Sequence, residues 1–257
     1  MLRWSVSLMA HEQKIRTMDS SEEAAKEYLE QLGLGPVIFE PDGNVCPDFL
    51  VGGRIAVEVR RLNQNESGDS GFRGLEETSR PLLSLVNGVL HSLGPGGSGE
   101  SWFISYTFKR PLPPYPKLRS DLHRALKPYL DNPRNEKGTT IRVGNNLKVT
   151  LVLRADKAYP TFFLVGSWSD PDSGGWVLAE TKRNLEICIN DKTPRMERVR
   201  YKYPEWWLVL LDKIGYGVNE CDLQLYKEHL GVQHTWDKVI IVNPLNPKCA
   251  FEIPRAV

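Results

Sequence analysis

The stretch CPDFLVGGRIAVEVRRLN, residues 46–63, carries Asp48, Glu58 and Arg60 on strands in which almost every other position is apolar. Two carboxylates are hard oxygen ligands of the kind that Mg²⁺ prefers, and a guanidinium binds phosphate oxygens in a fixed fork. These residue types could therefore hold a divalent metal and a phosphate. The alternative is that the three charges lie on a solvated face of the same strands.

The register of these strands decides whether the two carboxylates meet. Apolar and polar residues alternate on both sides of Gly52-Gly53, which predicts a β-hairpin. A two-residue loop would pair Asp48 with Val57 and mix the two faces. A three-residue loop that includes Arg54 pairs Asp48 with Glu58 and sorts every residue, so we prefer it. One face then holds Phe49, Val51, Ile55, Val57 and Val59, and the other holds Asp48, Leu50, Ala56, Glu58 and Arg60.

Two acids directly opposite each other on neighbouring strands repel, and a cation between them removes the repulsion. Mg²⁺ takes few protein carboxylates, keeps several waters and bridges to phosphate. The charged face of the hairpin is therefore a candidate site for Mg²⁺ or Mn²⁺, with Asp48 and Glu58 as its ligands.

Pro47-Asp48 followed by Glu58-x-Arg60 resembles the motif of the PD-(D/E)XK phosphodiesterases, the superfamily with the restriction-endonuclease-like fold. The resemblance implies that Asp48 and Glu58 hold a divalent metal and that the backbone carbonyl of Val59 completes the metal site. It also implies an activity, hydrolysis of the phosphodiester bonds of nucleic acid. The expected partner is nucleic acid, with DNA favoured over RNA, and no membrane is expected.

Arg60 stands where this family has a lysine that positions or activates the attacking water. An arginine does not give up its proton in a protein, so Arg60 is not a base, although it can clamp a phosphate oxygen. Two interpretations stay open: an active Mg²⁺-dependent nuclease, or an inactive nuclease-fold protein that binds nucleic acid or serves as a scaffold. A third, weaker one is an ordinary surface hairpin in an unrelated α/β protein.

The elements before the hairpin match the start of the family core, which runs helix, three strands, helix, strand. Residues 20–33 have an apolar stripe at helical spacing and end in glycine, and a short strand is expected at 37–40. Many family members bring a glutamate from the first helix to the metal, and Glu23 is the candidate here, with Glu27 one turn later. The competing interpretation of Glu23 is a capping box, Ser20-x-x-Glu23.

The resemblance to the family covers residues 20–63 and, for the later part of the core, residues 176–242. The stretch 176–192 reads as a basic helix, and 206–211 is an almost continuous apolar run, which predicts a strand buried on both faces. The segment between, 63–175, has no counterpart in the family and reads as an elaboration. Further predicted elements are helices at 79–93, 117–130 and 219–231, strands at 101–108, 161–168 and 238–244, and a hairpin over 140–155 that turns at Asn145-Asn146.

Helices that alternate with apolar strands predict the α/β class, a mixed central sheet flanked by helices. A chain of 257 residues is long enough to bury a full core as one domain. We therefore expect a single restriction-endonuclease-like domain over 20–257, with residues 63–175 as its elaborated middle. Residues 1–19 are expected to be an N-terminal extension, disordered or at least without a regular element.

Composition excludes several other classes. The four cysteines have no C-x-x-C spacing, which argues against a zinc site or a disulfide framework and favours a cytoplasmic protein. No apolar run approaches the length of a membrane span. The net charge of +1 gives no global attraction to nucleic acid, but the stretches 109–127 and 182–202 are locally basic. Beside a metal site such stretches would be phosphate contacts, and elsewhere they are solvated faces.

Overall fold

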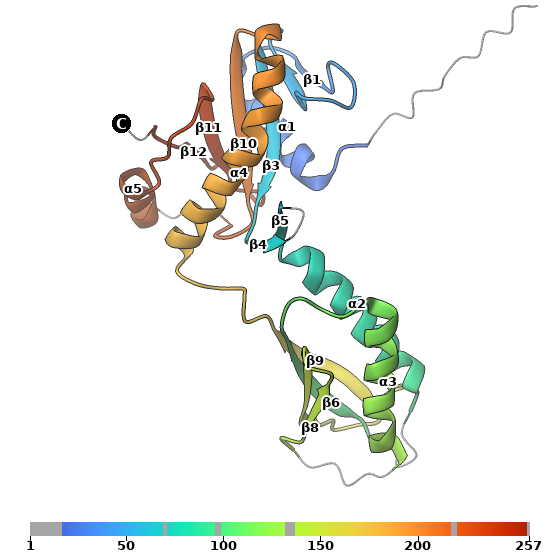
Figure 1. The fold of residues 1–257 in the computed structure, drawn as a ribbon. Coiled ribbons are helices and arrows are strands. Elements are labelled where there is room, and N and C mark those ends of the chain that lie inside the picture. The colour runs from blue at the N-terminus through green and yellow to red at the C-terminus, as the bar shows by residue number, and fades with distance from the viewer. Residues whose placement is uncertain (1–16, 69–70, 96–98, 132–136, 217–219, 256–257) are drawn as a thin grey trace, which may run out of the picture. The chain divides into compact units, whose positions relative to one another are not determined.

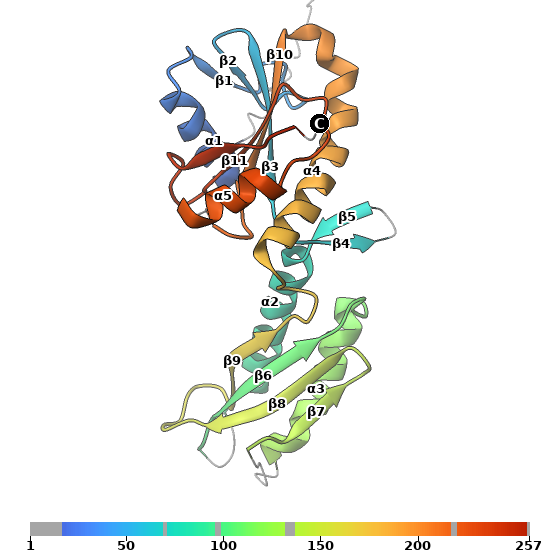
Figure 2. The ribbon, with the colours of Figure 1, turned by 90° about the vertical axis from the view of Figure 1, so that its left-hand side faces the viewer.

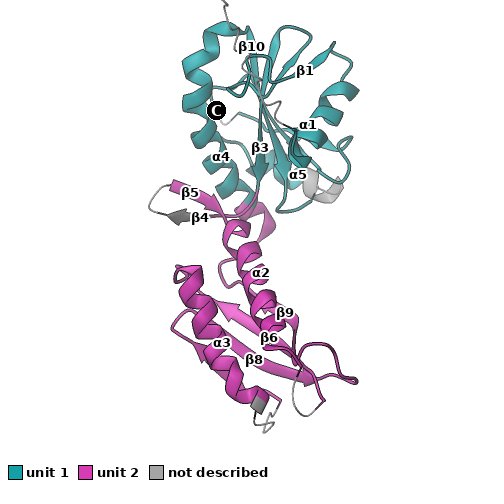
Figure 3. Ribbon diagram, turned by 90° about the vertical axis from the view of Figure 1, so that its right-hand side faces the viewer, with its two compact units in different colours: residues 1–62, 181–257 teal, residues 63–180 magenta. Residues whose placement is uncertain are grey.

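The protein is described from a computed structural model that covers residues 17–68, 71–95, 99–131, 137–216 and 220–255. The chain divides into two compact units, residues 1–62 with 181–257 (unit 1) and residues 63–180 (unit 2) (Figure 3). The sequence led us to expect one domain with an elaboration at 63–175. That segment forms unit 2, because its helices and strands bury a core of their own. Most of the expected extension, residues 1–16, lies outside the described residues.

Unit 1 contains a six-stranded mixed sheet in the order β1-β2-β3-β10-β11-β12 (Figure 1). The predicted α/β class is therefore confirmed. The strands β3, β10 and β11 are parallel, and the other neighbours are antiparallel. The elements of this unit are α1 (Ser20–Gln31), β1 (Val37–Phe39), β2 (Phe49–Val51), β3 (Ile55–Leu62), α4 (Val177–Val199), η1 (Arg200–Lys202), β10 (Glu205–Asp212), α5 (Glu220–His229), β11 (Lys238–Val242) and β12 (Ala250–Glu252).

The predicted hairpin is confirmed, with its three-residue loop. β2 and β3 pair antiparallel with Phe49 opposite Val57 and Val51 opposite Ile55. Gly52 has φ +57°, and a Cβ there would collide with the carbonyl oxygen of Leu34, so the turn requires glycine at this position. β3 lies between β2 and β10, in the interior of the sheet.

The two faces of this sheet are covered by different helices. The apolar face predicted for the hairpin packs against Ala25 and Leu29 of α1. The opposite face meets α4, where the Cys188 thiol donates to the carbonyl of Arg61. The strand β10, predicted from the apolar run 206–211, is buried along almost its whole length. Two charged side chains of β3, Glu58 and Arg60, therefore face α4, where they pair with Lys192 and Asp191.

The N-terminus of α1 differs from the sequence prediction by one residue. Asp19 is the N-cap, and its carboxylate accepts from the backbone N–H groups of Ser21 and Glu22. The Glu22 carboxylate accepts in return from the Asp19 N–H, so the capping box is Asp19-x-x-Glu22 and the predicted Ser20-x-x-Glu23 box is wrong. An ionised aspartate just before the serine is as good a cap and binds the N–H groups with a full charge.

Unit 2 combines a four-stranded sheet, in the order β7-β8-β6-β9, with a separate two-stranded one, β4-β5. The helices α2 and α3 pack on one face of the larger sheet and close its core. Its elements are β4 (Asn65–Gly68), β5 (Gly71–Gly74), α2 (Glu76–Leu93), β6 (Trp102–Phe108), α3 (Tyr115–Asp131), β7 (Thr140–Val143), β8 (Leu147–Arg154) and β9 (Phe163–Ser169). The predicted hairpin that turns at Asn145-Asn146 is confirmed. None of the described helices has both the length and the apolar character of a membrane span.

Candidate active site

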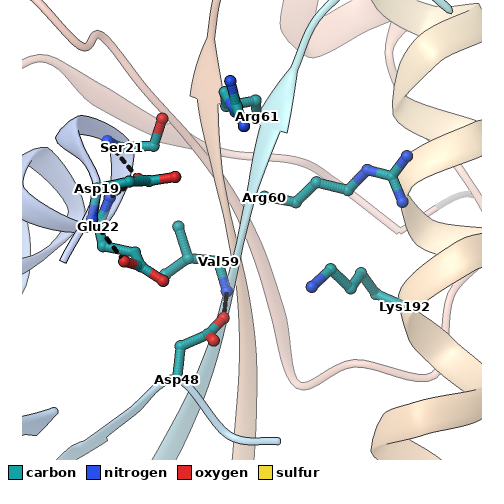
Figure 4. Close-up of a pocket in the computed structure, with 8 residues that line it drawn as sticks. All are labelled: Asp19, Ser21, Glu22, Asp48, Val59, Arg60, Arg61 and Lys192. Carbon is teal, nitrogen blue, oxygen red and sulfur yellow. Dashed lines mark hydrogen bonds between the residues drawn. The ribbon is translucent and has the colours of Figure 1, made fainter. Parts of the chain in front are cut away.

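The hairpin brings the two predicted carboxylates to one pocket. Asp48 directly precedes β2, and its Oδ2 accepts a hydrogen bond of 2.7 Å from the backbone N–H of Val59 (Figure 4). Glu58, in the middle of β3, is almost fully buried. Asp48 and Glu58 line a pocket of about 250 Å³ together with Cys46 and Lys192. The two carboxylates therefore share a site, as the three-residue loop predicted.

Lys192 is the site residue that the sequence analysis missed. It extends from α4 toward β3 (Figure 4). Its Nζ lies 2.6 Å from Glu58 Oε1, and both side chains are largely buried. A signal for it exists in the sequence. Lys192 lies one helical turn from both Cys188 and Met196, which are buried, so the lysine occupies the apolar stripe of its helix. A lysine in such a stripe needs an acidic partner in the core.

The second carboxylate oxygen of Glu58 has no such partner. Glu58 Oε2 is buried and makes no hydrogen bond to the described residues. An unsatisfied buried acceptor costs about 1–3 kcal/mol, and more when it carries charge. A cation bound between Glu58 and Asp48 would remove this cost.

These residues fit a Mg²⁺ or Mn²⁺ ion that is shared with a phosphate. The described residues contain no group of three or more His, Cys, Asp or Glu side chains able to hold a metal. Mg²⁺ does not require such a cage, because one or two carboxylates suffice when waters and phosphate oxygens complete its shell. The pair Asp48 and Glu58 matches that smaller donor set.

The protonation of Asp48 reflects how the site is built. Burial raises the pKa of Asp48 to about 6, and the negative charges of Glu58 and, to a smaller extent, Glu22 act in the same direction. The Val59 N–H and the Lys192 ammonium oppose the increase. Asp48 is therefore ionised at neutral pH at a cost in free energy, which a bound cation would offset.

The acid that α1 presents to the site is Glu22, and Glu23 is exposed to solvent. A second pocket, of about 210 Å³, adjoins the same carboxylate and is lined by Asp19, Ser21, Glu22, Asp48, Val59, Arg60, Arg61 and Lys192. Figure 4 shows Glu22 directed toward Asp48 and Val59. Glu23, the predicted candidate, is not among the lining residues. Glu22 faces inward in place of Glu23 because Asp19 is the N-cap of α1 and the Glu22 side chain folds back onto the Asp19 N–H.

Arg60 lies on the α4 side of β3, near Lys192 (Figure 4). Its guanidinium pairs with the carboxylate of Asp191, and its side chain is 17% exposed. Val59 also lines the second pocket. It contacts the site through its backbone N–H, which donates a hydrogen bond to the Asp48 carboxylate. Asp48 and Lys192 line both pockets, whereas Glu58 lines only the first and Arg60 only the second.

Comparisons with protein-family models, with curated proteins and with solved structures found no match for this chain. What the site can do follows from its residues and their geometry. A buried pair of carboxylates attracts a divalent cation, and the neighbouring ammonium and guanidinium attract a phosphate.

Proposed function

We propose that unit 1 hydrolyses phosphodiester bonds of nucleic acid with a Mg²⁺ or Mn²⁺ ion held by Asp48 and Glu58. The observation that carries this proposal is the position of Lys192, whose Nζ lies 2.6 Å from Glu58 Oε1 in the pocket that Asp48 also lines. Two acids and an amine are the groups that this reaction needs. The amine of Lys192 lies 134 residues from Glu58 along the chain.

The order of elements in unit 1 supports an assignment to the PD-(D/E)XK superfamily. A helix, three strands, a helix and a strand follow one another as α1, β1, β2, β3, α4 and β10. We infer that Lys192 supplies the amine that the motif lacks, since position 60 holds arginine. The motif would then be completed by a lysine from a neighbouring helix.

The residues around the pocket have separable roles in this reaction. A bound divalent ion would lower the pKa of a water and stabilise the charge that develops on the phosphate. Asp48 and Glu58 hold that ion. Lys192 donates hydrogen bonds from Nζ to phosphate oxygens from a largely buried position, where electrostatic stabilisation is strong. Arg60 clamps a further phosphate oxygen, in exchange for its pair with Asp191.

A second candidate function is a non-catalytic nucleic-acid-binding or scaffold protein with the same fold. The observation that favours it is that the charges already neutralise one another within the chain, Lys192 with Glu58 and Arg60 with Asp191. In such a protein the Lys192 ammonium would neutralise the carboxylates permanently, and no metal ion would bind there. Metal binding therefore discriminates between the two candidates.

The test is calorimetric titration with Mg²⁺ and Mn²⁺, beside a nuclease assay on single- and double-stranded DNA and RNA. The parent protein is expected to bind one ion and cleave, and Asp48→Ala is expected to lose both properties. Asp42→Ala is a matched control, because Asp42 pairs with Lys202 and lines neither pocket. An absence of both metal binding and cleavage in the folded parent protein would reject the nuclease and leave the binding protein.

A further inference from the structure

The larger sheet of unit 2 has helices on one face only. The apolar side chains of β6, β7 and β8 pack against α2 and α3, and Figure 2 shows the strands in front of α3. In this unit no described helix covers the opposite face. Because side chains alternate along a strand, the paired registers decide which residues share that open face.

One row of the open face is cationic. Arg142 lies opposite Lys148, and Lys148 lies opposite Thr107. Both cations are exposed, and neither forms an ion pair with any described residue. Like charges directly opposite each other on neighbouring strands destabilise a sheet, so this pair has a cost that an anionic ligand would offset.

The charge on this face is of one sign. The four strands β6, β7, β8 and β9 contain no aspartate or glutamate. Lys109, Arg142 and Lys148 line a hollow of about 260 Å³ beside the amide side chains of Asn145 and Asn146. The lining of this hollow combines three cationic side chains with two side-chain amides and contains no carboxylate. Such a surface is complementary to phosphate.

The next row along the strands carries hydroxyl groups. Thr140 lies opposite Thr150, with their Oγ1 atoms 3.4 Å apart, and the Ser167 hydroxyl donates to Ser105 Oγ at 3.0 Å. Each hydroxyl is both a donor and an acceptor, so this row can bind sugar oxygens and the edges of bases.

The third row is apolar and aromatic. Phe103 lies between Leu153 and Leu164, and the Leu153 side chain is 54% exposed. Tyr159 packs edge-on against Phe103, with ring centroids 6.3 Å apart. A partly exposed aromatic ring held in place by neighbours is a platform on which an unpaired base stacks.

We propose that this open face binds a single-stranded segment of nucleic acid, with its phosphates on the row of Arg142 and Lys148 and its bases toward Phe103. The rows lie two residues apart along the strands, roughly 7 Å, and their order from charge to hydroxyl to ring follows a nucleotide from phosphate through sugar to base. A duplex keeps its base faces stacked and offers none to Phe103. The inference rests on the proposed function for the class of partner, but its test needs no cleavage.

The experiment measures binding of the full chain to a labelled 15-residue oligothymidylate by fluorescence anisotropy in EDTA, over a range of salt concentrations. Arg142→Glu with Lys148→Glu is expected to weaken binding tenfold or more at low salt. Losing two phosphate contacts should also reduce the salt-dependence slope by about 1.4, since each contact on a single strand contributes about 0.7. Phe103→Ala is expected to weaken binding several-fold and leave the slope unchanged.

The matched control is Arg119→Glu with Lys127→Glu, the same change of charge on exposed positions of α3. It should bind like the parent protein, and an equal loss in both double variants would overturn the proposal. Tighter binding of a 15-base-pair duplex, or binding to phosphatidylserine vesicles without binding to the oligonucleotide, would overturn it too.

Two further variants keep this test separate from folding and from cleavage. Where a circular dichroism melt shows that the charge reversal unfolds, Arg142→Gln with Lys148→Gln replaces it and is expected to reduce the slope equally. Asp48→Ala is expected to bind the oligonucleotide like the parent protein. If the parent protein does not cleave but binds the oligonucleotide as expected, only the proposed hydrolysis is rejected. If it cleaves but the variants of this face bind like the parent protein, only this face is rejected.

Discussion

The site on β3 and the open face of the unit 2 sheet use charge in opposite ways. At the first, Asp48, Glu58 and Lys192 are enclosed between strand and helix, and the pKa of Asp48 is raised to about 6. At the second, Arg142 and Lys148 are exposed and have no acid on their strands. Buried charges of both signs suit chemistry, because their interactions are strong and specific. Exposed charges of one sign suit affinity, because they act on any polyanion.

Substitution of Lys192 is expected to have the largest effect, because it should reduce cleavage at the β3 site and leave oligonucleotide binding by the unit 2 face unchanged. Lys192→Met should reduce kcat for cleavage by about 10²–10³-fold, because a donor is lost where charge develops in a low dielectric. Binding of the oligonucleotide in EDTA should not change. Lys182→Met, an exposed position on the same helix, is the control and should cleave like the parent protein. Cleavage by Lys192→Met at the parent rate would remove this lysine from the reaction.

Arg60 is expected to have the next largest effect. Arg60→Ala should lower cleavage on the order of 10²-fold if the guanidinium stabilises charge in the transition state. Arg60→Lys separates two interpretations. Activity stays low if the bidentate fork matters, and it is preserved or rises if the arginine merely replaces the family lysine. Rates measured on one oligonucleotide under single-turnover conditions are sufficient to tell them apart.

A smaller effect, about tenfold, is expected at the N-terminus of α1. Glu22→Gln removes a negative charge that acts on Asp48, and so weakens the attraction of the site for a divalent ion. Glu23→Gln, the adjacent exposed position, should leave metal affinity unchanged. Calorimetric titration with Mn²⁺ gives both values. If Glu23→Gln has the larger effect, the assignment of the inward-facing acid is incorrect.

The last and smallest effect concerns the stability of the folded protein. The folded state holds the Asp48 proton up to a pH of about 6, whereas the unfolded chain releases it near 3.9. The metal-free protein should therefore lose stability as the pH rises from about 4 to 6, since the folded state binds more protons in that window. Asp48→Asn should remove this dependence and stabilise the protein at pH 8 by up to about 3 kcal/mol.

Chemical denaturation at pH 5 and pH 8 in EDTA measures this difference. Added Mg²⁺ should stabilise the parent protein at pH 8 and have no such effect on Asp48→Asn. Cleavage should decline as the pH falls through about 6, because a proton then competes for Asp48. The oligonucleotide affinity of the unit 2 face should be constant over the same range, since its four strands contain no aspartate, glutamate or histidine.

Local patterns in the sequence determined the elements and the hairpin register. Alternation with a period of two on both sides of Gly52-Gly53 was enough to predict the pairing of Phe49 with Val57 and of Val51 with Ile55. That register brings Asp48 and Glu58 to one pocket. The apolar run of β10 and the stripes of α2 and α3 were equally readable, because burial leaves a periodic trace along the chain.

Only the tertiary structure decided which charges meet. Lys192 reaches Glu58 across 134 residues of chain, and no local pattern specifies that contact. The choice of Glu22 over Glu23 depended on one residue of helix phase at the cap. The division into two units depended on whether residues 63–180 could bury a core of their own. Each of these follows from packing between segments far apart in the chain, and the free energy of such contacts leaves no periodic signature in sequence.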